Sequence, residues 1–234
     1  ELGRNEHASD IDSARLIAEA RTIPEVPGYT VAADASTHVG LSGDFYDLQR
    51  RCGTLRFTLV DAMGHGIGAA LIAAGIRASL RTDPSRTLAQ AMADADRVIA
   101  DEFGELDIFA TGVYGDLDLD TGVLEMVDAG HGLAFILCAD GSWTPLRSKG
   151  LPLGLGTGKV AEREPIRATL APGDTLVCCS DGLLDVLDPE DPFGQAARTI
   201  RERGAHGAVA LVAELARDER ATDDITAIVI QRDA

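Results

Sequence analysis

The strand patterns of this 234-residue chain come in runs, and this order limits the fold more than any other feature of the sequence. Three strand patterns follow one another across residues 29–62, and two hairpin patterns cover residues 109–146. Helical patterns separate these runs, and two more, over about 192–203 and 207–217, precede a last strand at 223–231. Because strands and helices do not alternate one by one, the order predicts an α+β fold with antiparallel sheets and helices packed on their faces.

A break in pattern sets the first 24 residues apart from the rest. "SDIDSARLIAEART" reads as a helix with Ser9 as a candidate N-cap, and the two prolines and the glycine of "IPEVPGY" end it. We therefore divide the chain into an N-terminal helix and linker, residues 1–24, and one domain, residues 25–234. The helix could pack on the domain, form a dimer or link to an upstream sensor. The opening "ELGRNEHASD" carries no signal-peptide pattern and suggests a piece of a larger protein.

Charge narrows the classes of partner. Acidic residues outnumber basic ones 38 to 21, which gives a net charge of −17. A nucleic-acid binder normally carries a basic face, and an acidic protein is repelled by anionic membranes. We expect neither nucleic-acid binding nor membrane insertion, and a phosphorylated substrate would need cations at the site.

The cysteines indicate a reducing compartment. The four cysteines include the adjacent pair Cys178-Cys179 and contain no CxxC spacing, so a thiolate zinc site is not expected. Buried reduced thiols, together with the lack of any apolar stretch of about 18 residues, favour a cytoplasmic protein.

Four aspartates lie where an apolar strand pattern meets a turn. Asp44 lies near the start of one strand and Asp61 at the end of the next; Asp181 ends "TLVCCS", and Asp223 opens "DDITAIVI". If these strand ends converge, they form an all-oxygen cavity that selects Mg²⁺ or Mn²⁺. The alternative is that each aspartate binds only the backbone of its own turn. Asp47, three residues after Asp44, would face the other side of a regular strand and is the weaker candidate.

Six motifs in order carry a family resemblance: "SGDFYD", "DAMGHGIGAAL", "DAGHG", "GLPLGL", "GDTLVCCSDGLLD" and "TDDITAIVI". Together they resemble the metal-dependent protein phosphatase family (PPM, type 2C), and most closely its SpoIIE/RsbU-like bacterial branch. The similarity covers about residues 25–234. Each motif is short, but the ordered set is specific.

The resemblance implies a fold, a reaction and a set of ligands. The fold would be a four-layer α-β-β-α sandwich of two antiparallel sheets flanked by helices. The reaction would be hydrolysis of phosphoserine or phosphothreonine on a protein by a hydroxide that two Mn²⁺ or Mg²⁺ ions activate. By position, Asp61 matches the bridging ligand, Ala62 a backbone-carbonyl ligand, Asp181 and Asp223 further ligands, and Asp44 the residue that holds metal-bound water. In this branch the usual substrate is a phosphorylated anti-anti-sigma (STAS) protein.

Several positions depart from the family pattern. Ser42 replaces a common glycine, and Asp128 and Asp224 stand where asparagine is common. His65 lies four residues after the bridging aspartate instead of two, so the family's general-acid role is not carried over; it is expected to be structural. His131 aligns with an aspartate of a third metal site, which leaves that site open.

Three further residues are assigned only to a region. Asp185 could contribute to a third metal site. Arg77 and Lys149 are both candidates for the family's phosphate-clamping cation, and the sequence does not choose between them.

Other readings remain beside this one. "GLGTG" at 154–158 lacks the GxGxxG spacing of a nucleotide loop and is read as a plain loop. Cys178 and Cys179 are read as core residues, because burial beside carboxylates raises a thiol pKa. The alternative function is a non-catalytic phosphoprotein-binding or sensor module of the same fold.

Overall fold

The computed structural model describes residues 22–37, 41–83, 85–103, 108–155, 163–218 and 220–234. Within these ranges the strands form two five-stranded sheets, and all the strand pairs are antiparallel. Sheet A has the order β1 (Tyr29–Ser36), β10 (Ile225–Arg232), β9 (Thr175–Cys179), β6 (Ala134–Leu137) and β7 (Trp143–Pro145). Sheet B has the order β2 (Asp44–Arg51), β3 (Thr54–Ala62), β4 (Ala110–Asp118), β5 (Val123–Ala129) and β8 (Ile166–Thr169).

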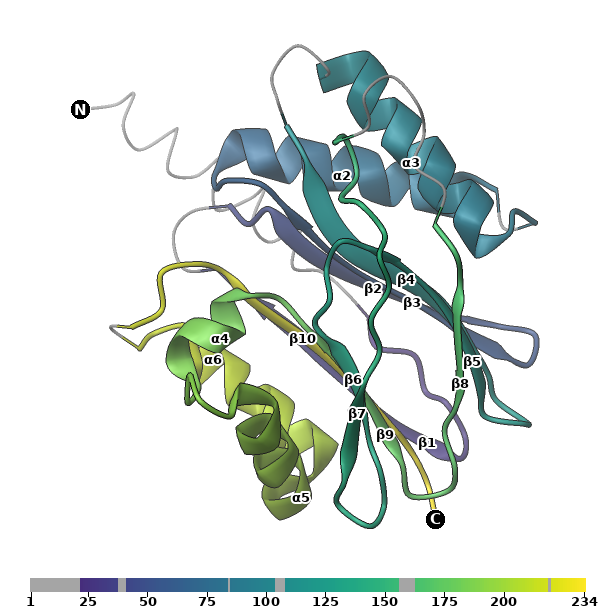
Figure 1. Cartoon of the computed structure of the whole chain (residues 1–234), viewed down its shortest axis with the longest axis vertical. Coiled ribbons are helices and arrows are strands. Elements are labelled where there is room, and N and C mark those ends of the chain that lie inside the picture. The colour runs from purple at the N-terminus through teal and green to yellow at the C-terminus, as the bar shows by residue number, and fades with distance from the viewer. Residues whose placement is uncertain (1–21, 38–40, 84, 104–107, 156–162, 219) are drawn as a thin grey trace.

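Helices cover the outer side of each sheet. Figure 1 shows α2 and α3 over sheet B, and α4, α5 and α6 against sheet A. Their bounds are α2 Ile67–Thr82, α3 Leu88–Phe103, α4 Gly182–Val186, α5 Pro192–Ala210 and α6 Val212–Leu215. This arrangement confirms the predicted α+β sandwich of two antiparallel sheets flanked by helices.

Alternation along the strands separates two packing layers. Leu55, Phe57 and Leu59 of β3 are fully buried in the core between the two sheets, whereas Val60 packs toward α2 and α3. Since successive side chains of a strand point to opposite faces, Asp61 continues the inner row. The same parity places Asp44 on the inner face of β2 and Asp47 on the outer face.

Hydrogen bonds between Asp47 and two arginines of α2, which we call the polar latch, confirm that the Asp47 side chain points outward. Its carboxylate accepts hydrogen bonds from Arg81 Nε at 2.9 Å and from Arg77 Nη2 at 3.4 Å, both on α2. Asp47 is therefore used to hold α2 on sheet B. Arg77 points to this latch, which argues against its role as the phosphate-clamping cation.

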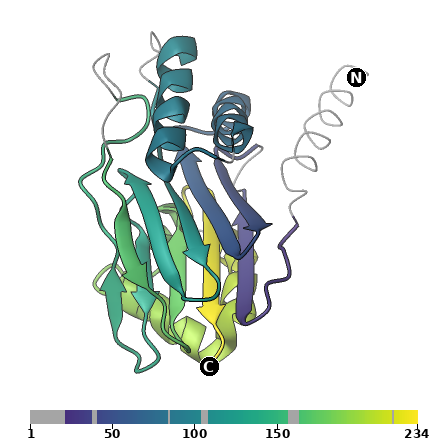
Figure 2. The same cartoon turned by 90° about the vertical axis from the view of Figure 1, so that its right-hand side faces the viewer.

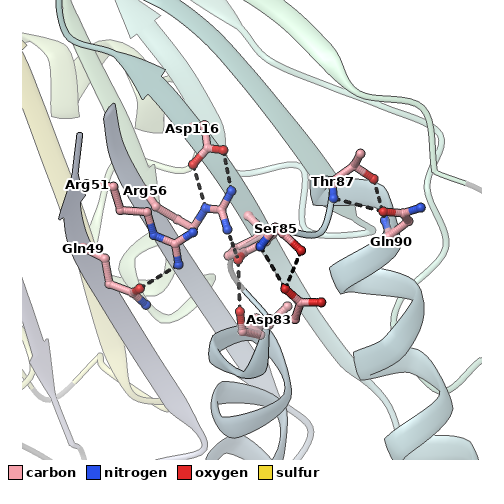
Figure 3. Close-up of polar contacts among 10 residues, drawn as sticks. Gln49, Arg51, Arg56, Asp83, Ser85, Thr87, Gln90 and Asp116 are labelled. Atoms are coloured by element: carbon pink, nitrogen blue, oxygen red, sulfur yellow. Dashed lines mark hydrogen bonds and ion pairs between the residues drawn. The ribbon is translucent and has the colours of Figure 1, made fainter. Parts of the chain in front are cut away.

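Polar contacts join β3 to β4 and cap the start of α3. Figure 3 shows Arg56 paired with Asp116 through both carboxylate oxygens, at 2.6 and 2.7 Å. Thr87 and Gln90 exchange hydrogen bonds between backbone N–H and side-chain oxygen, which is a capping box at the start of α3. Figure 2, which looks nearly along α2, shows this helix beside α3.

A buried ion pair ties α3 to the loop after β7. Arg163 and Asp96 side chains are 2% and 3% exposed, and their closest atoms lie 3.0 Å apart. Arg163 also donates to the carbonyls of Leu151 and Pro152, and Asp96 accepts from the N–H of Gly154. This network holds the loop at residues 151–155 against sheet B, where Leu153 bridges to β4.

The sequence missed two elements and placed a third well. The edge strand β8 has four residues and the helix α4 five, too short for a clear periodic pattern. The expected break between two C-terminal helices occurs at Gly204, whose φ of 69° is non-helical. The expected helix at residues 9–22 lies outside the described residues apart from its last position. No helix in the described part of the chain is long and apolar enough to span a membrane.

Candidate active site

The β2–β3 hairpin brings the first two candidate ligands together. Asp44 and Asp61 are directly paired across the two strands and share the inner face. Asp44 is 5% exposed, and its Oδ2 atom makes no hydrogen bond within the described residues. Burial, followed by the charge of Asp61, raises the pKa of Asp44 well above its usual value. An unsatisfied buried carboxylate oxygen is costly, so this atom is suited to a cation or a bound water.

The other two candidates come from sheet A. Asp181 follows β9 and Asp223 precedes β10, and these strands are neighbours in the sheet. The Asp181 side chain does not cap the helix that it precedes, so it is not used in the way the turn alternative requires. The Asp223 side chain does accept the N–H of the next residue, at 2.8 Å.

Carboxylates of both sheets lie close enough to act on one acid, Asp61. Burial, then the charges of Asp181 and Asp223, raise the pKa of Asp61 to about 7. Like charges shift one another's pKa in this way only when they lie close together. All four predicted aspartates therefore face one edge of the sandwich.

Close backbone packing forms the turn between β3 and α2. A Cβ atom at Gly43 would lie 2.6 Å from the carbonyl oxygen of Ala62, so only glycine allows this approach. Gly64 and Gly66 have φ values of 87° and 82°, which favour glycine. The N–H of Met63 donates to Phe109 O at 3.0 Å. The turn that presents Ala62 is thus held on both sides.

The oxygen atoms of the predicted ligands fit a hard divalent cation, but the side chains do not surround a single point. Among the described residues, no three Asp, Glu, His or Cys side chains form a group ready to hold a metal ion. The set is nonetheless all oxygen, it includes the unsatisfied Oδ2 of Asp44, and its members repel one another. A bound cation would remove that repulsion. Asp44, Asp61, Ala62, Asp181 and Asp223 remain predictions as ligands.

Two buried hydroxyls behind the carboxylates were missed by the sequence analysis. Ser180 and Thr226 are fully buried, and both continue the inner rows of their strands. Their hydroxyls lie close enough to Asp44 to lower its pKa in part, yet Thr226 Oγ1 has no hydrogen-bond partner within the described residues. Ser180 Oγ accepts the N–H of Thr226 at 2.9 Å. The strand parity, extended past the end of β9, is the signal that could have found them.

Two of the departures from the family pattern, Asp128 and His131, have structural explanations. Asp128 Oδ1 accepts the N–H groups of His131 and Gly132, at 2.7 and 3.4 Å, two bonds that a single asparagine oxygen could also accept. His131 is buried, and its Nε2 lies 2.7 Å from the carbonyl oxygen of Cys179. Burial lowers the pKa of His131, so the neutral ring donates from Nε2, and Nδ1 accepts from Thr111 Oγ1 at 3.0 Å. Both ring nitrogens are therefore engaged in holding strands together.

The remaining candidate residues differ in how exposed their side chains are. His65 is exposed in the turn before α2, and Lys149 is exposed in the loop after β7. Asp185 binds the Thr222 hydroxyl at 2.5 Å. Cys179 is buried in β9, and burial raises its thiol pKa to about 12, so it is a core residue as predicted. Cys178 is equally buried, and its pKa is also raised.

Comparisons with known proteins place this geometry in a family. Residues 51–233 match the family described as Stage II sporulation protein E (SpoIIE). The phosphoserine phosphatase RsbU of Bacillus subtilis is 24% identical over 222 residues, covering 90% of this chain and 65% of that protein. Protein IcfG of Synechocystis is 24% identical over 201 residues, covering 74% of this chain and 31% of that protein. The chain thus spans less than two thirds of the length of either relative.

Solved structures share the fold. The RsbU and RsbW domains of Rv1364c from Mycobacterium tuberculosis match with a TM-score of 0.75 and 25% identity, covering 90% of this chain and 62% of that one. The catalytic domain of the serine/threonine phosphatase PstP, solved with two manganese ions, matches with a TM-score of 0.66 and 17% identity, covering 88% of this chain and 99% of that one. Because the family match extends over well more than half of the sequence, the chain belongs to the SpoIIE family of type 2C (PP2C) protein phosphatases, in its RsbU-like bacterial branch.

Proposed function

We propose that this chain is a metal-dependent protein phosphatase that hydrolyses phosphoserine or phosphothreonine on a regulatory protein. The observation that carries the proposal is the convergence of Asp44 and Asp61 from sheet B with Asp181 and Asp223 from sheet A. The carboxylates around Asp61 repel one another, and cations bound there would remove this repulsion, which favours a metal site over four independent turns.

The proposed cofactor is a pair of Mn²⁺ or Mg²⁺ ions. Asp61, Asp181, Asp223 and the carbonyl of Ala62 would hold them, and Asp44 would orient a water molecule through its unsatisfied Oδ2. When bound, such ions supply an activated water nucleophile and neutralise the charge of the phosphoryl group. Support comes from relatives, since PstP was solved with two manganese ions and RsbX with magnesium.

This chain's own residues position the reacting groups. The turn after β3 is fixed by its glycines and by the hydrogen bond from Met63 to Phe109, so Ala62 has a set position relative to Asp61. The adjacent thiols are un-ionised at neutral pH because burial raises their pKa, and no phosphoenzyme on cysteine is expected. Water is the nucleophile that we propose.

The proposed substrate is a phosphorylated anti-anti-sigma protein with a STAS domain. RsbU, a phosphoserine phosphatase, is a relative over 90% of this chain, and a solved relative joins RsbU and RsbW domains. We also propose that residues 1–24 form a regulatory or dimerisation segment, and that the protein is cytoplasmic, in keeping with its four free cysteines. Deletion of residues 1–24 should change the activity or the oligomeric state; if it changes neither, the segment has no such role.

Hydrolysis of p-nitrophenyl phosphate and of a phosphoserine protein, with Mn²⁺ and with EDTA, tests the function. We expect activity with Mn²⁺, loss with EDTA, and loss of at least about 100-fold in Asp61→Asn, a magnitude typical of losing a group that stabilises transition-state charge. Activity that survives EDTA would contradict the metal mechanism.

A non-catalytic phosphoprotein-binding module is the second candidate. The observation in its favour is that, in the described residues, no three acidic side chains lie close enough together to hold a metal ion as they stand. Calorimetry distinguishes the two, because absence of Mn²⁺ binding would favour the binding module.

A further inference from the structure

The N-terminal half of α2 and the turn before it carry an exposed apolar stripe beside the candidate active site. We define the α2 stripe as Met63, Ile67 and Leu71, whose exposed fractions are 42%, 60% and 63%. Successive members are four residues apart, so Ile67 and Leu71 lie on one side of the helix. Large apolar side chains at this level of exposure cost free energy unless something covers them.

The stripe is not required by the core of the domain. The opposite side of α2 buries Ala69, Ile72, Ala73 and Ile76 against sheet B. Farther along, the helix is held by its polar latch to Asp47 and by the Tyr114 hydroxyl, which donates to Leu80 O at 3.1 Å. The fold therefore leaves Ile67 and Leu71 available for a contact from outside the domain.

The sequence around the stripe is free of formal charge. Residues 62–76, "AMGHGIGAALIAAGI", contain no Asp, Glu, Lys or Arg, in a chain in which such residues make up 25%. An ordinary solvent-facing helix carries charged residues on its outer side. A long uncharged outer side is typical of a surface that contacts another protein.

The stripe is held in place relative to the carboxylates. Met63 comes two residues after Asp61, and its N–H is bound to Phe109 O; Gly66 N donates to Leu41 O at 3.0 Å. Two further exposed leucines, Leu151 and Leu155, flank Leu153, which bridges to β4 beside the end of β3. Of the seven exposed large apolar residues in the described ranges, five thus lie on segments that meet this end of sheet B.

Charge argues for an apolar mode of substrate binding. The chain carries a net charge of −17, and a phosphorylated protein adds negative charge at the group to be removed. The net charge of the chain therefore does not attract such a substrate, and contacts beside the phosphate would add to the affinity that cations at the site supply. The α2 stripe is continuous with the site and carries no charge that would repel such a partner.

We propose that the α2 stripe binds an apolar segment of the phosphoprotein substrate, next to its phosphorylated residue. This inference rests on the proposed phosphatase function and adds a requirement on the substrate. The enzyme would select phosphoserine or phosphothreonine sites that have large apolar side chains a few residues away.

A matched pair of fluorescent phosphoserine peptides tests the inference. One peptide carries leucines roughly three to six positions from the phosphoserine, which an extended chain places about 10–20 Å away from it. The other peptide carries serines at those positions. Binding is measured by fluorescence anisotropy and hydrolysis by phosphate release, both with Mn²⁺. We expect the unaltered protein to prefer the leucine peptide at least 10-fold in Kd and in kcat/KM.

The double variant Ile67→Gln/Leu71→Gln should reduce that preference to less than 2-fold, since glutamine keeps helix propensity while removing the apolar surface. Val123→Gln is the matched control, because Val123 is 45% exposed at the other end of sheet B; it should keep the preference.

If the peptides bind with the expected preference but are not hydrolysed, the phosphatase function fails and the docking surface stands. Equal binding of both peptides by the unaltered protein, or a preference that the double variant keeps, would overturn the proposal. So would a change in sedimentation from dimer to monomer with the preference intact, because the stripe would then join two copies.

Discussion

Substitution of Asp61 by asparagine should stabilise the metal-free protein while it abolishes activity. Asp61 is partly buried and faces Asp181 and Asp223, which, together with burial, raise its pKa to about 7. Because the folded state holds this proton more tightly than the unfolded chain, the group favours folding fully below pH 4. That contribution is lost as the pH rises through 7. In the absence of metal, the ionised carboxylate therefore costs stability at pH 8.

The size of the effect follows from the pKa difference. The rise from 3.8 to about 7 corresponds to an upper limit of about 4 kcal/mol at pH 8, at about 1.4 kcal/mol per pH unit. Neighbouring carboxylates can relax once one charge is gone, and asparagine does not recover the full solvation of the acid, so we expect a gain of about 2 kcal/mol. The gain should shrink toward zero as the pH is lowered to 4.

Urea unfolding with EDTA, followed by fluorescence of the single tryptophan, Trp143, measures this difference. Trp143 packs against Phe135 and Phe193, so its emission reports loss of the packing around sheet A. Asp47→Asn is the matched control, because Asp47 lies on the opposite face of β2 in an ion pair; it should destabilise the protein with or without metal. With saturating Mn²⁺ the order of Asp61→Asn and the unaltered protein should reverse. Asp61→Asn that is no more stable than the unaltered protein in EDTA at pH 8 would refute the reasoning.

Three further outcomes are expected. Mn²⁺ should raise the melting temperature at pH 8 and much less at pH 5.5, because protons compete with the cation for the raised carboxylates; an equal rise at both pH values, by scanning fluorimetry, would contradict this. Arg163→Met should cost about 3–5 kcal/mol in urea unfolding, since it leaves Asp96 buried without its ion pair; Arg163→Met combined with Asp96→Leu should recover most of the loss, and no recovery would place the cost elsewhere. Gly43→Ala should weaken Mn²⁺ binding in calorimetry at least about 10-fold, because the new methyl group meets the carbonyl of Ala62, whereas Gly68→Ala, with open space around it, should not; this scale corresponds to about 1.4 kcal/mol.

The sequence predicted much of the architecture because its signals are local. Strand alternation, the hairpin turn at residues 120–122 and the glycine at 204 determine where elements begin and end, and the structure follows them. The elements that it missed, β8 and α4, are short and depend on neighbours. Leu124 of β5, for example, pairs with Ala168 of β8 only when the sheet has formed.

The candidate site was predicted in part for the same reason. Four aspartates at strand ends are visible in the sequence, and strand parity correctly turned Asp47 away from Asp44. The role of Arg77 was not visible, since its partner Asp47 is 30 residues away and on another element. Strand parity places Thr226 on an inner face, but only the tertiary structure shows that its hydroxyl lies beside Asp44.

The sequence by itself determined the alternating strands, the turns and the positions of the acidic residues, because these depend on side-chain period and backbone conformation over a few residues. The tertiary structure decided which carboxylates meet. Asp44 and Asp61 belong to one sheet, Asp181 and Asp223 to the other, and only the stacking of the two sheets brings their charges close enough to raise the pKa of Asp61 to about 7. Electrostatic repulsion depends on distance in space, and distances between sheets are not contained in any local pattern.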